Sequence, residues 1–313
     1  YIEVEEFLFN RGYFNSQINN TTSRPALTPA VEIFLKRRNG EISAEDSALL
    51  IDNLKSIDSR DQYNKYFIRE AITQQHYLTV NGGGKELAWT IAGGYDNIRN
   101  FQGATNDKIN LRVNNSYKPV KNLLINLGFY YTNLKSEGPG TPEYNSIKIN
   151  GRTVPYLLFV DADGVPVALD HELRSGYTDT AGEGKLLDWK YYPYENHKHV
   201  RSKSLKQDLM AQIGLNYQIV NGIDVEIQYQ HQKQNLFGEN LFDLQSYEAR
   251  NIINRYSQLN RSTGVVTYVV PKGGIFRTSQ SQIKSQNFRS QLNVNRQWFD
   301  HRIVSIVGFE TRE

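Results

Sequence analysis

The stretch Tyr77-Leu-Thr-Val-Asn-Gly-Gly-Gly-Lys-Glu-Leu-Ala-Trp-Thr-Ile-Ala-Gly-Gly-Tyr95 decides the fold, because it contains two alternating segments on either side of a glycine turn. In the second segment Leu87, Trp89 and Ile91 alternate with residues that are smaller or more polar. Successive side chains of a β-strand point to opposite faces. The pattern therefore predicts a β-hairpin with one apolar face, and the fold depends on what that face contacts.

The same period of two recurs along most of the chain after Gln74, which favours strands. It predicts about eight strands, near residues 74–81, 86–95, 108–117, 122–133, 204–217, 223–231, 287–295 and 302–310. On the apolar side of these strands we expect Leu87, Trp89, Ile91, Leu111, Val113, Ile125 and Leu127. On the polar side we expect Asn110, Arg112, Asn114, Lys206, Asp208 and Glu226.

Short and long connections alternate between the expected strands. Residues 81–85, 118–121, 218–222 and 297–300 form short turns, whereas residues 133–203 and 232–285 are far longer than ordinary loops. Aromatic residues such as Tyr95, Tyr117 and Tyr131 lie toward strand ends. Short turns on one side, long loops on the other and aromatic girdles are typical of outer-membrane β-barrels, whose strands alternate between an apolar outer face and a polar lumen.

A soluble antiparallel sheet with one solvated face alternates in the same way. A secreted β-sheet module that binds glycans is therefore the alternative interpretation. In the barrel interpretation the apolar set faces lipid and the polar set faces the lumen. The charges of that polar set are then interpreted as a solvated or plug-contacting wall rather than as specific substrate ligands.

Composition excludes several classes of protein. The chain has 313 residues and no cysteine, so it forms neither disulfides nor thiolate metal sites. Its net charge of +3 and the lack of a basic block argue against binding of nucleic acid. No run reaches the 18 or so apolar residues of a membrane helix. Both ends look cut, so we expect an internal piece of a longer protein.

Residues 1–70 differ from the rest of the chain. Short helices are expected over 3–9 and 29–36, and Ser43-Ala-Glu-Asp46 predicts the start of a third helix by its capping-box pattern. We therefore divide the chain into a helical or irregular outside loop region, residues 1–70, and a barrel region, residues 71–313.

Several segments resemble the SusC/RagA family of TonB-dependent outer-membrane transporters. The run Asp61-Gln-Tyr-Asn-Lys-Tyr-Phe-Ile-Arg-Glu-Ala-Ile-Thr-Gln-Gln-His-Tyr-Leu-Thr-Val-Asn-Gly-Gly83 is similar to a family segment that leads into a strand ending in paired glycines. The strands Ala88–Asp96, Lys108–Asn114, Asn122–Tyr131 and His301–Glu313 also resemble strands of that family. The resemblance is strongest over 61–135 and does not extend to the long loops.

This resemblance implies an early part of a larger barrel whose plug domain has no counterpart in the sequence. It also implies import of a large nutrient, an oligosaccharide or an oligopeptide, across the bacterial outer membrane. The implied partners are a SusD-like surface lipoprotein and, through the plug, the TonB complex. The family uses no cofactor that these residues would hold.

Few residue patterns indicate chemistry beyond transport. The aromatic cluster Trp189, Tyr191, Tyr192 and Tyr194 lies in the longest loop and either contacts substrate or partner or packs the loop's own core. His171, His197 and His199 are interpreted as solvated loop histidines rather than metal ligands, and Asp163-Gly164 as a hairpin turn rather than a calcium loop. No nucleophile or metal motif is present, and we expect neither a metal site nor an enzyme.

Overall fold

The structure, a computed structural model, describes all of residues 1–313. One antiparallel sheet of eight strands dominates it, with strand order β1-β2-β3-β4-β5-β6-β9-β10. These strands are β1 (Ile72–Gly83), β2 (Leu87–Arg99), β3 (Thr105–Val120), β4 (Leu123–Pro139), β5 (Val200–Val220), β6 (Ile223–Phe242), β9 (Ile275–Trp298) and β10 (His301–Arg312). Neighbours in sequence are neighbours in the sheet, so the expected number of strands and their antiparallel pairing are confirmed.

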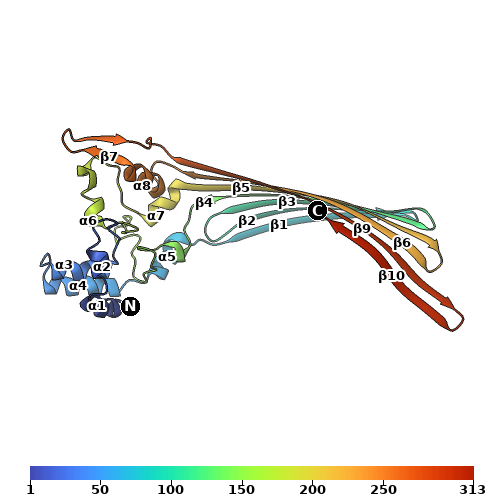
Figure 1. The fold of residues 1–313 in the computed structure, drawn as a ribbon, viewed down its shortest axis with the longest axis horizontal. Helices are drawn as coiled ribbons and strands as arrows, with labels where there is room; N and C mark the ends of the chain where they lie inside the picture. Colours follow the sequence, from blue (N-terminus) through green and yellow to red (C-terminus); the bar gives the residue numbers. More distant parts are fainter.

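The sheet is long, curved and open (Figure 1). The four short turns lie at one end, and the helices gather at the other end together with the N-terminus. In the β5–β6 turn Gly222 has φ 78°, a left-handed backbone conformation that glycine adopts freely. A methyl group at this position would lie 2.2 Å from the carbonyl oxygen of Asn295, so the turn requires glycine on steric grounds as well.

The strands extend further toward the helical end than expected from the sequence. β4 continues to Pro139, β5 begins at Val200, β6 continues to Phe242 and β9 begins at Ile275, so the long connections are residues 140–199 and 243–274. The boundaries 133–203 and 232–285 were therefore too wide. The added strand residues are mostly polar on both faces, and the apolar ones among them, such as Leu236, Phe237 and Ile283, do not alternate regularly, so these segments carry no strand signal. β9 has 24 residues, a length of about 80 Å.

Helices occupy the N-terminal region and the two long connections. They are α1 (Ile2–Asn10), α2 (Asn15–Ile18), α3 (Pro29–Arg38), α4 (Ala44–Lys55), α5 (Ser59–Phe67), α6 (Ser175–Thr178), α7 (Pro193–Asn196) and α8 (Tyr247–Arg255), with 3₁₀ turns at Tyr144–Ser146, Ala181–Gly184 and His197–His199. Ser43 caps α4 by accepting a hydrogen bond from the Asp46 amide at 2.9 Å, as its sequence pattern predicts. A small hairpin of β7 (Ser257–Asn260) and β8 (Val265–Tyr268) follows α8. None of the helices is long and apolar enough to pass through a membrane.

The hydrophobic core lies outside the sheet. We call residues 1–71, 140–199 and 243–274 together the loop cap, because they gather at the far end of the strands. A cluster of 23 buried residues fills this loop cap, and it joins the N-terminal helices to the first long connection and to Tyr247 of α8. In the eight-stranded sheet, by contrast, only Ala92 and Val200 are buried hydrophobic residues. The N-terminal region is therefore packed together with the long loops.

Two buried polar residues connect separate segments of the loop cap. The carboxylate of Glu5 in α1 accepts hydrogen bonds from the hydroxyls of Thr28, at 2.8 Å, and Tyr156. Burial raises the pKa of Glu5, although these two hydrogen bonds act in the opposite direction. Ser59 at the start of α5 donates to the Val154 carbonyl at 3.0 Å and accepts from the Leu157 amide. These contacts attach α1 and α5 to the segment that follows β4.

Candidate functional site

The pairing register gives the sheet one apolar face. Leu87 pairs with Tyr117, Ile91 pairs with Val113, and residues paired directly across an antiparallel ladder share a face. Continuing the register places all seven residues of the predicted apolar set on that face: Leu87, Trp89, Ile91, Leu111, Val113, Ile125 and Leu127. The same face continues through Ile213, Tyr229 and Phe288 to β10. That these residues face lipid stays a prediction.

No other part of the chain covers the apolar face. The exposed fraction is 44% for Ile91, 46% for Leu127 and 39% for Ile213. In a two-layered soluble sheet such residues would be buried against the second layer. Contiguous exposed apolar surface of this extent marks an interaction site, and in this sheet it follows the strands. The apolar face is therefore open to a contact from outside this chain.

The apolar residues form a band with defined borders. Leu87–Tyr95, Ile109–Tyr117, Leu123–Tyr131 and Leu209–Tyr217 each span nine residues, close to the 9–11 that a tilted membrane strand needs. Toward the loop cap, the apolar run of the band ends on β2 to β10 at Tyr95, Ile109, Tyr131, Leu209, Tyr229, Phe288 and Phe309, and only the isolated Leu205, Phe237, Leu241 and Phe276 are apolar beyond it on the same face. The next positions on the same face are Asn97, Asp107, Asn133, Gln207, His231, Gln286 and Thr311. Five of the seven border residues are aromatic, as in a membrane girdle.

This border is staggered regularly across the sheet. Compared with the residue paired to it on the preceding strand, the border lies two residues closer to the short turns on β4, four residues closer on β6 and two residues closer on β10. At the other three steps it does not move. Eight residues in six steps, at about 3.4 Å per residue and about 4.8 Å between strands, correspond to a strand tilt of about 40° relative to the band. Membrane barrels have strand tilts of about 35–45°.

The opposite face is hydrophilic and internally hydrogen bonded. It carries the whole predicted polar set: Asn110, Arg112, Asn114, Lys206, Asp208 and Glu226. Thr132 donates to Asn110 at 3.1 Å, Tyr130 donates to Asn114 at 2.8 Å, and Gln232 donates to Asp208 at 3.0 Å. Amide and hydroxyl groups thus satisfy one another from strand to strand. A lumen-facing role for this set stays a prediction.

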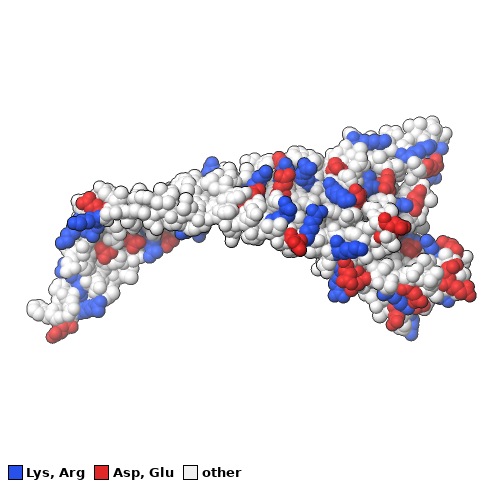
Figure 2. All heavy atoms as spheres, turned by 180° about the vertical axis from the view of Figure 1, so that it is seen from behind, with Lys and Arg blue, Asp and Glu red and all other residues white.

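Charged side chains are concentrated at the loop cap and on the strand segments beside it (Figure 2). They become sparse along the stretch of strands that follows. On the apolar face, six residues beyond the border residue Tyr131 of β4, Glu137 lies between Lys135, at 3.7 Å, and Lys203 of β5, at 3.4 Å. This change of polarity agrees with the border drawn from the register.

The four aromatic candidates of the longest loop are not equivalent. Trp189 and Tyr191 are only 7% and 8% exposed. The Trp189 indole nitrogen donates to Asn251 at 2.9 Å, and the Tyr191 ring packs 5.1 Å from that of Tyr247. For these two residues the structure gives the packing role that the sequence left open. Tyr192 and Tyr194 are half-buried, and contact with substrate or partner stays a prediction for them.

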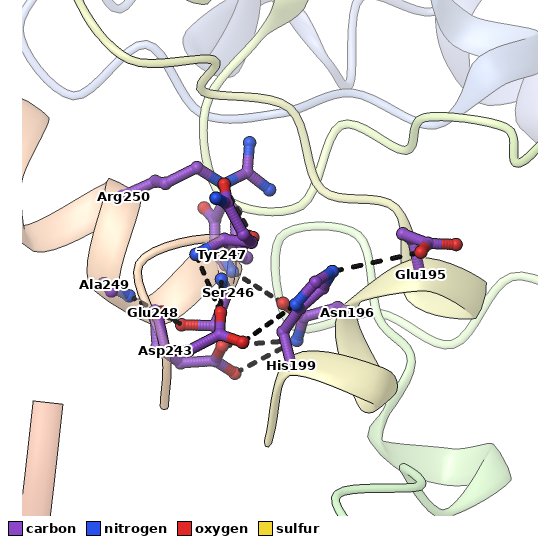
Figure 3. Close-up of polar contacts among 10 residues, drawn as sticks. Glu195, Asn196, His199, Asp243, Ser246, Tyr247, Glu248, Ala249 and Arg250 are labelled. Atoms are coloured by element: carbon purple, nitrogen blue, oxygen red, sulfur yellow. Dashed lines mark hydrogen bonds and ion pairs between the residues drawn. The ribbon is translucent and has the colours of Figure 1, made fainter. Parts of the chain in front are cut away.

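A polar junction that the sequence analysis missed holds the two long connections together (Figure 3). Asn196 accepts a hydrogen bond from the Tyr247 amide at 2.6 Å and donates to the Glu248 carboxylate at 3.2 Å. His199, at the base of β5, contacts Asp243, at the end of β6, at 2.9 Å. Ser246 caps α8, and an N-cap serine followed by an acidic first turn was the available signal. The junction fixes the direction in which both loops leave the strands.

The turn and histidine interpretations can also be compared with the structure. Asp161 accepts hydrogen bonds from the Asp163 and Val165 amides, and Gly164 has φ 84°, so this segment is a tight turn as expected. His197, expected to be solvated, is instead buried, and its ring packs at a tilt against that of Phe67, with 5.4 Å between the ring centroids. Burial lowers the pKa of His197. Its buried location reflects long-range packing that local sequence does not encode.

Comparison with known proteins adds evidence on the fold. No family model matches the sequence, and neither does any curated protein. Among solved structures, the chain is similar to the RagAB peptide importer in the "closed-closed" state, with a TM-score of 0.54, and to the RagAB peptide transporter, with a TM-score of 0.55. Both share 13% identity with it over 80% of this chain.

The fold is shared. The chain spans about a quarter of the length of the solved chains it matches, since 25% of each is covered. The expected fold class, an all-β antiparallel segment of a larger barrel with long loops and a helical N-terminal excursion, is confirmed. At 13% identity the likeness concerns fold alone, and the activity of the whole protein is a matter for proposal.

Proposed function

We propose that this chain forms part of the wall and the outside loops of a TonB-dependent importer in the bacterial outer membrane. The cargo would be a large nutrient, an oligopeptide or an oligosaccharide. The observation that carries the proposal is the staggered apolar band, nine residues high on four strands, with polar residues above it and a hydrophilic face behind it. A bilayer imposes parallel borders on tilted strands, whereas a protein core does not.

Each part of the molecule then has a task. The band containing Ile91 and Leu127 contacts acyl chains, and the face containing Arg112 and Asp208 lines a water-filled lumen. In lipid every backbone amide must find a partner, so the free edges of β1 and β10 pair with further strands in a closed wall. The short turns face the periplasm, and the loop cap faces the outside of the cell.

The proposed partners follow from the same assignment. A lumen wall in this class surrounds a plug, and energy reaches that plug through the TonB complex. The importer and the transporter of similar fold are named RagAB, and their names give peptides as the cargo. Together with the resemblance to the SusC/RagA family, this supports a SusD-like lipoprotein as the partner that covers the loop cap. We propose no catalytic residue and no cofactor.

The alternative, a soluble glycan-binding module, has less support. It needs a layer that covers residues such as Ile91 and Ile213, and both are more than a third exposed. It also gives no reason for a border that shifts steadily from strand to strand.

Two measurements on the native, full-length protein test the proposal. Membrane fractionation is expected to place it in the outer membrane, with release only by detergent. Cells lacking it are expected to lose uptake of a fluorescent oligopeptide or oligosaccharide mixture, and a protonophore should abolish uptake in cells that keep it. Recovery of the protein in a detergent-free supernatant would overturn the membrane assignment. Uptake that resists the protonophore would overturn the energised mechanism.

A further inference from the structure

A pocket of about 410 Å³ lies in the loop cap, where three separate segments of the chain meet. Its lining includes Arg24 from the N-terminal region, Asn150, Glu172, Tyr177 and Trp189 from the first long connection, and Arg255 at the end of α8. We call it the seam pocket. Its volume lies within the range of small-molecule sites.

The walls of the seam pocket are held rigidly. Pro25 and Leu173 form an antiparallel bridge, in which the Ala26 amide donates to the Glu172 carbonyl at 2.9 Å and the Arg174 amide donates to the Arg24 carbonyl at 3.1 Å. This bridge joins the N-terminal region to the long connection, and both of its residues line the pocket. The pocket is therefore preformed, and binding of a ligand loses little conformational entropy in the protein.

Two lining residues have unusual backbone conformations. Arg24 has φ 43° and Asn150 has φ 46°, and only two other non-glycine residues in the chain have a positive φ. Such conformations persist where surrounding structure enforces them, and they cluster at ligand sites. Two of the four non-glycine residues with a positive φ in the chain thus line one pocket.

Arg24 is the residue with unused binding capacity. Its guanidinium lies 4.2 Å from the centroid of the Tyr177 ring, and its side chain makes no hydrogen bond or ion pair within the protein. The second arginine, Arg255, forms an ion pair with Glu172. The two arginines and one carboxylate leave a net positive charge at the pocket. Tyr177 and Trp189, with ring centroids 5.8 Å apart, supply an apolar wall beside it.

We propose that the seam pocket binds a carboxylate group of the imported nutrient, with Arg24 as its principal ligand. A guanidinium fork matches a carboxylate with two parallel hydrogen bonds, and stacking on Tyr177 already orients the fork. The carboxylate is either the free C-terminus of an oligopeptide or the acid group of a uronic-acid sugar. This inference rests on the proposed import function and specifies which end of the cargo the loop cap recognises.

Calorimetric titration of the full-length protein in detergent tests the inference. The probes are N-acetyl-trialanine, its C-terminal amide, digalacturonate and a neutral disaccharide. One acid probe is expected to bind about tenfold or more tightly than its uncharged counterpart, the range of a charge-assisted hydrogen bond. The peptide pair and the sugar pair distinguish the two sources of the carboxylate.

Variants locate the binding. Arg24→Gln is expected to remove the preference for the acid, and Arg24→Lys to retain part of it. Arg11→Gln is the matched control, because Arg11 also stacks on a ring, that of Phe7 at 5.0 Å, but does not line the pocket. Thermal unfolding shows that each variant folds. Equal affinity for acid and uncharged probes in the wild type, or an undiminished preference in Arg24→Gln, would overturn the inference. Fractionation and uptake test the import function independently, so the two failures are distinguishable.

Discussion

Placing a charge at the centre of the apolar band gives the sharpest test of the membrane assignment. Ile91 lies four residues from each end of the band segment Leu87–Tyr95. With about 3.4 Å per residue and a strand tilt of about 40°, Ile91 lies about 10 Å from either border of the band, measured perpendicular to the border. The perturbation is Ile91→Arg, compared with Tyr95→Arg at the border and Thr90→Arg, which adds the same side chain to the opposite face of the same strand.

The expected costs differ in a way that only lipid produces. An arginine at the midplane of a membrane barrel costs about 2–4 kcal/mol, and one near the interface costs about 0–1 kcal/mol. On the polar face, Thr90→Arg is expected to change the free energy of unfolding by about 0.5 kcal/mol or less, as for an exposed site in water. A loss of about 3 kcal/mol at Ile91 would lower the ratio of folded to unfolded protein by about two orders of magnitude.

The assay is guanidinium unfolding of the full-length protein reconstituted in phospholipid vesicles, with the slope of the transition checked for constancy. The order of destabilisation is expected to be Ile91→Arg, then Tyr95→Arg, then Thr90→Arg. If Ile91→Arg and Thr90→Arg cost the same within about 1 kcal/mol, the apolar face does not contact lipid, because an exposed surface in water tolerates either change.

Three further measurements examine other parts of the structure. In variants that retain a single tryptophan, lipids brominated on their acyl chains should quench Trp89 in the apolar band but not Trp189 in the loop cap; equal quenching would contradict the separation of band and cap. Because the pKa of Glu5 is raised in the native state, its carboxyl group stays protonated there at pH values just above 4.5, the ordinary pKa, whereas the unfolded chain loses the proton. The free energy of unfolding should therefore fall as the pH rises from about 4.5 through the raised pKa of Glu5, and Glu5→Gln should flatten this dependence in unfolding curves. An identical pH profile in the variant would show that Glu5 is not the cause. Ser59→Ala leaves the Leu157 amide without its acceptor and should lower the free energy of unfolding by about 1–3 kcal/mol in tryptophan-monitored melting, whereas the exposed Ser23→Ala should have little effect; equal effects would reject the role of Ser59.

Sequence alternation predicts the sheet well because each strand in the band has one apolar face and one polar face. For the residues from Leu87 to Tyr95, the sequence alone shows which side chains belong to which face, without knowledge of the neighbouring strands. Beyond the band both faces of a strand meet polar surroundings, so residues such as Gln280 and Ser281 of β9 show no period. Strand length therefore had to come from the pairing register, and the loops were predicted too long.

The loop cap could be predicted only in part. Helix starts such as Ser43 are local, and their capping pattern is visible in sequence. The packing of Phe67 against Phe159 and Tyr194 joins residues far apart in the chain, and no local pattern reports it. The seam pocket was missed for the same reason: Arg24 and Tyr177 meet only after two segments far apart in the sequence have folded together.

The two regions of the molecule are stabilised in different ways, and this difference connects the fold to the function. The loop cap has a buried core of its own, whereas the sheet has almost none and exposes residues such as Leu127 and Phe309. In water each hydrogen bond along the strands contributes only about 0.5–1.5 kcal/mol, because folding exchanges protein–water for protein–protein hydrogen bonds. In hydrocarbon there is no water to bond with the backbone N–H and C=O groups, so these groups can bond only with neighbouring strands. Breaking a strand-to-strand hydrogen bond there costs far more than it does in water. Under the proposed function the strands depend on a bilayer to remain a sheet, while the loop cap, with a buried core of its own, keeps its shape in the water above it, where cargo would arrive.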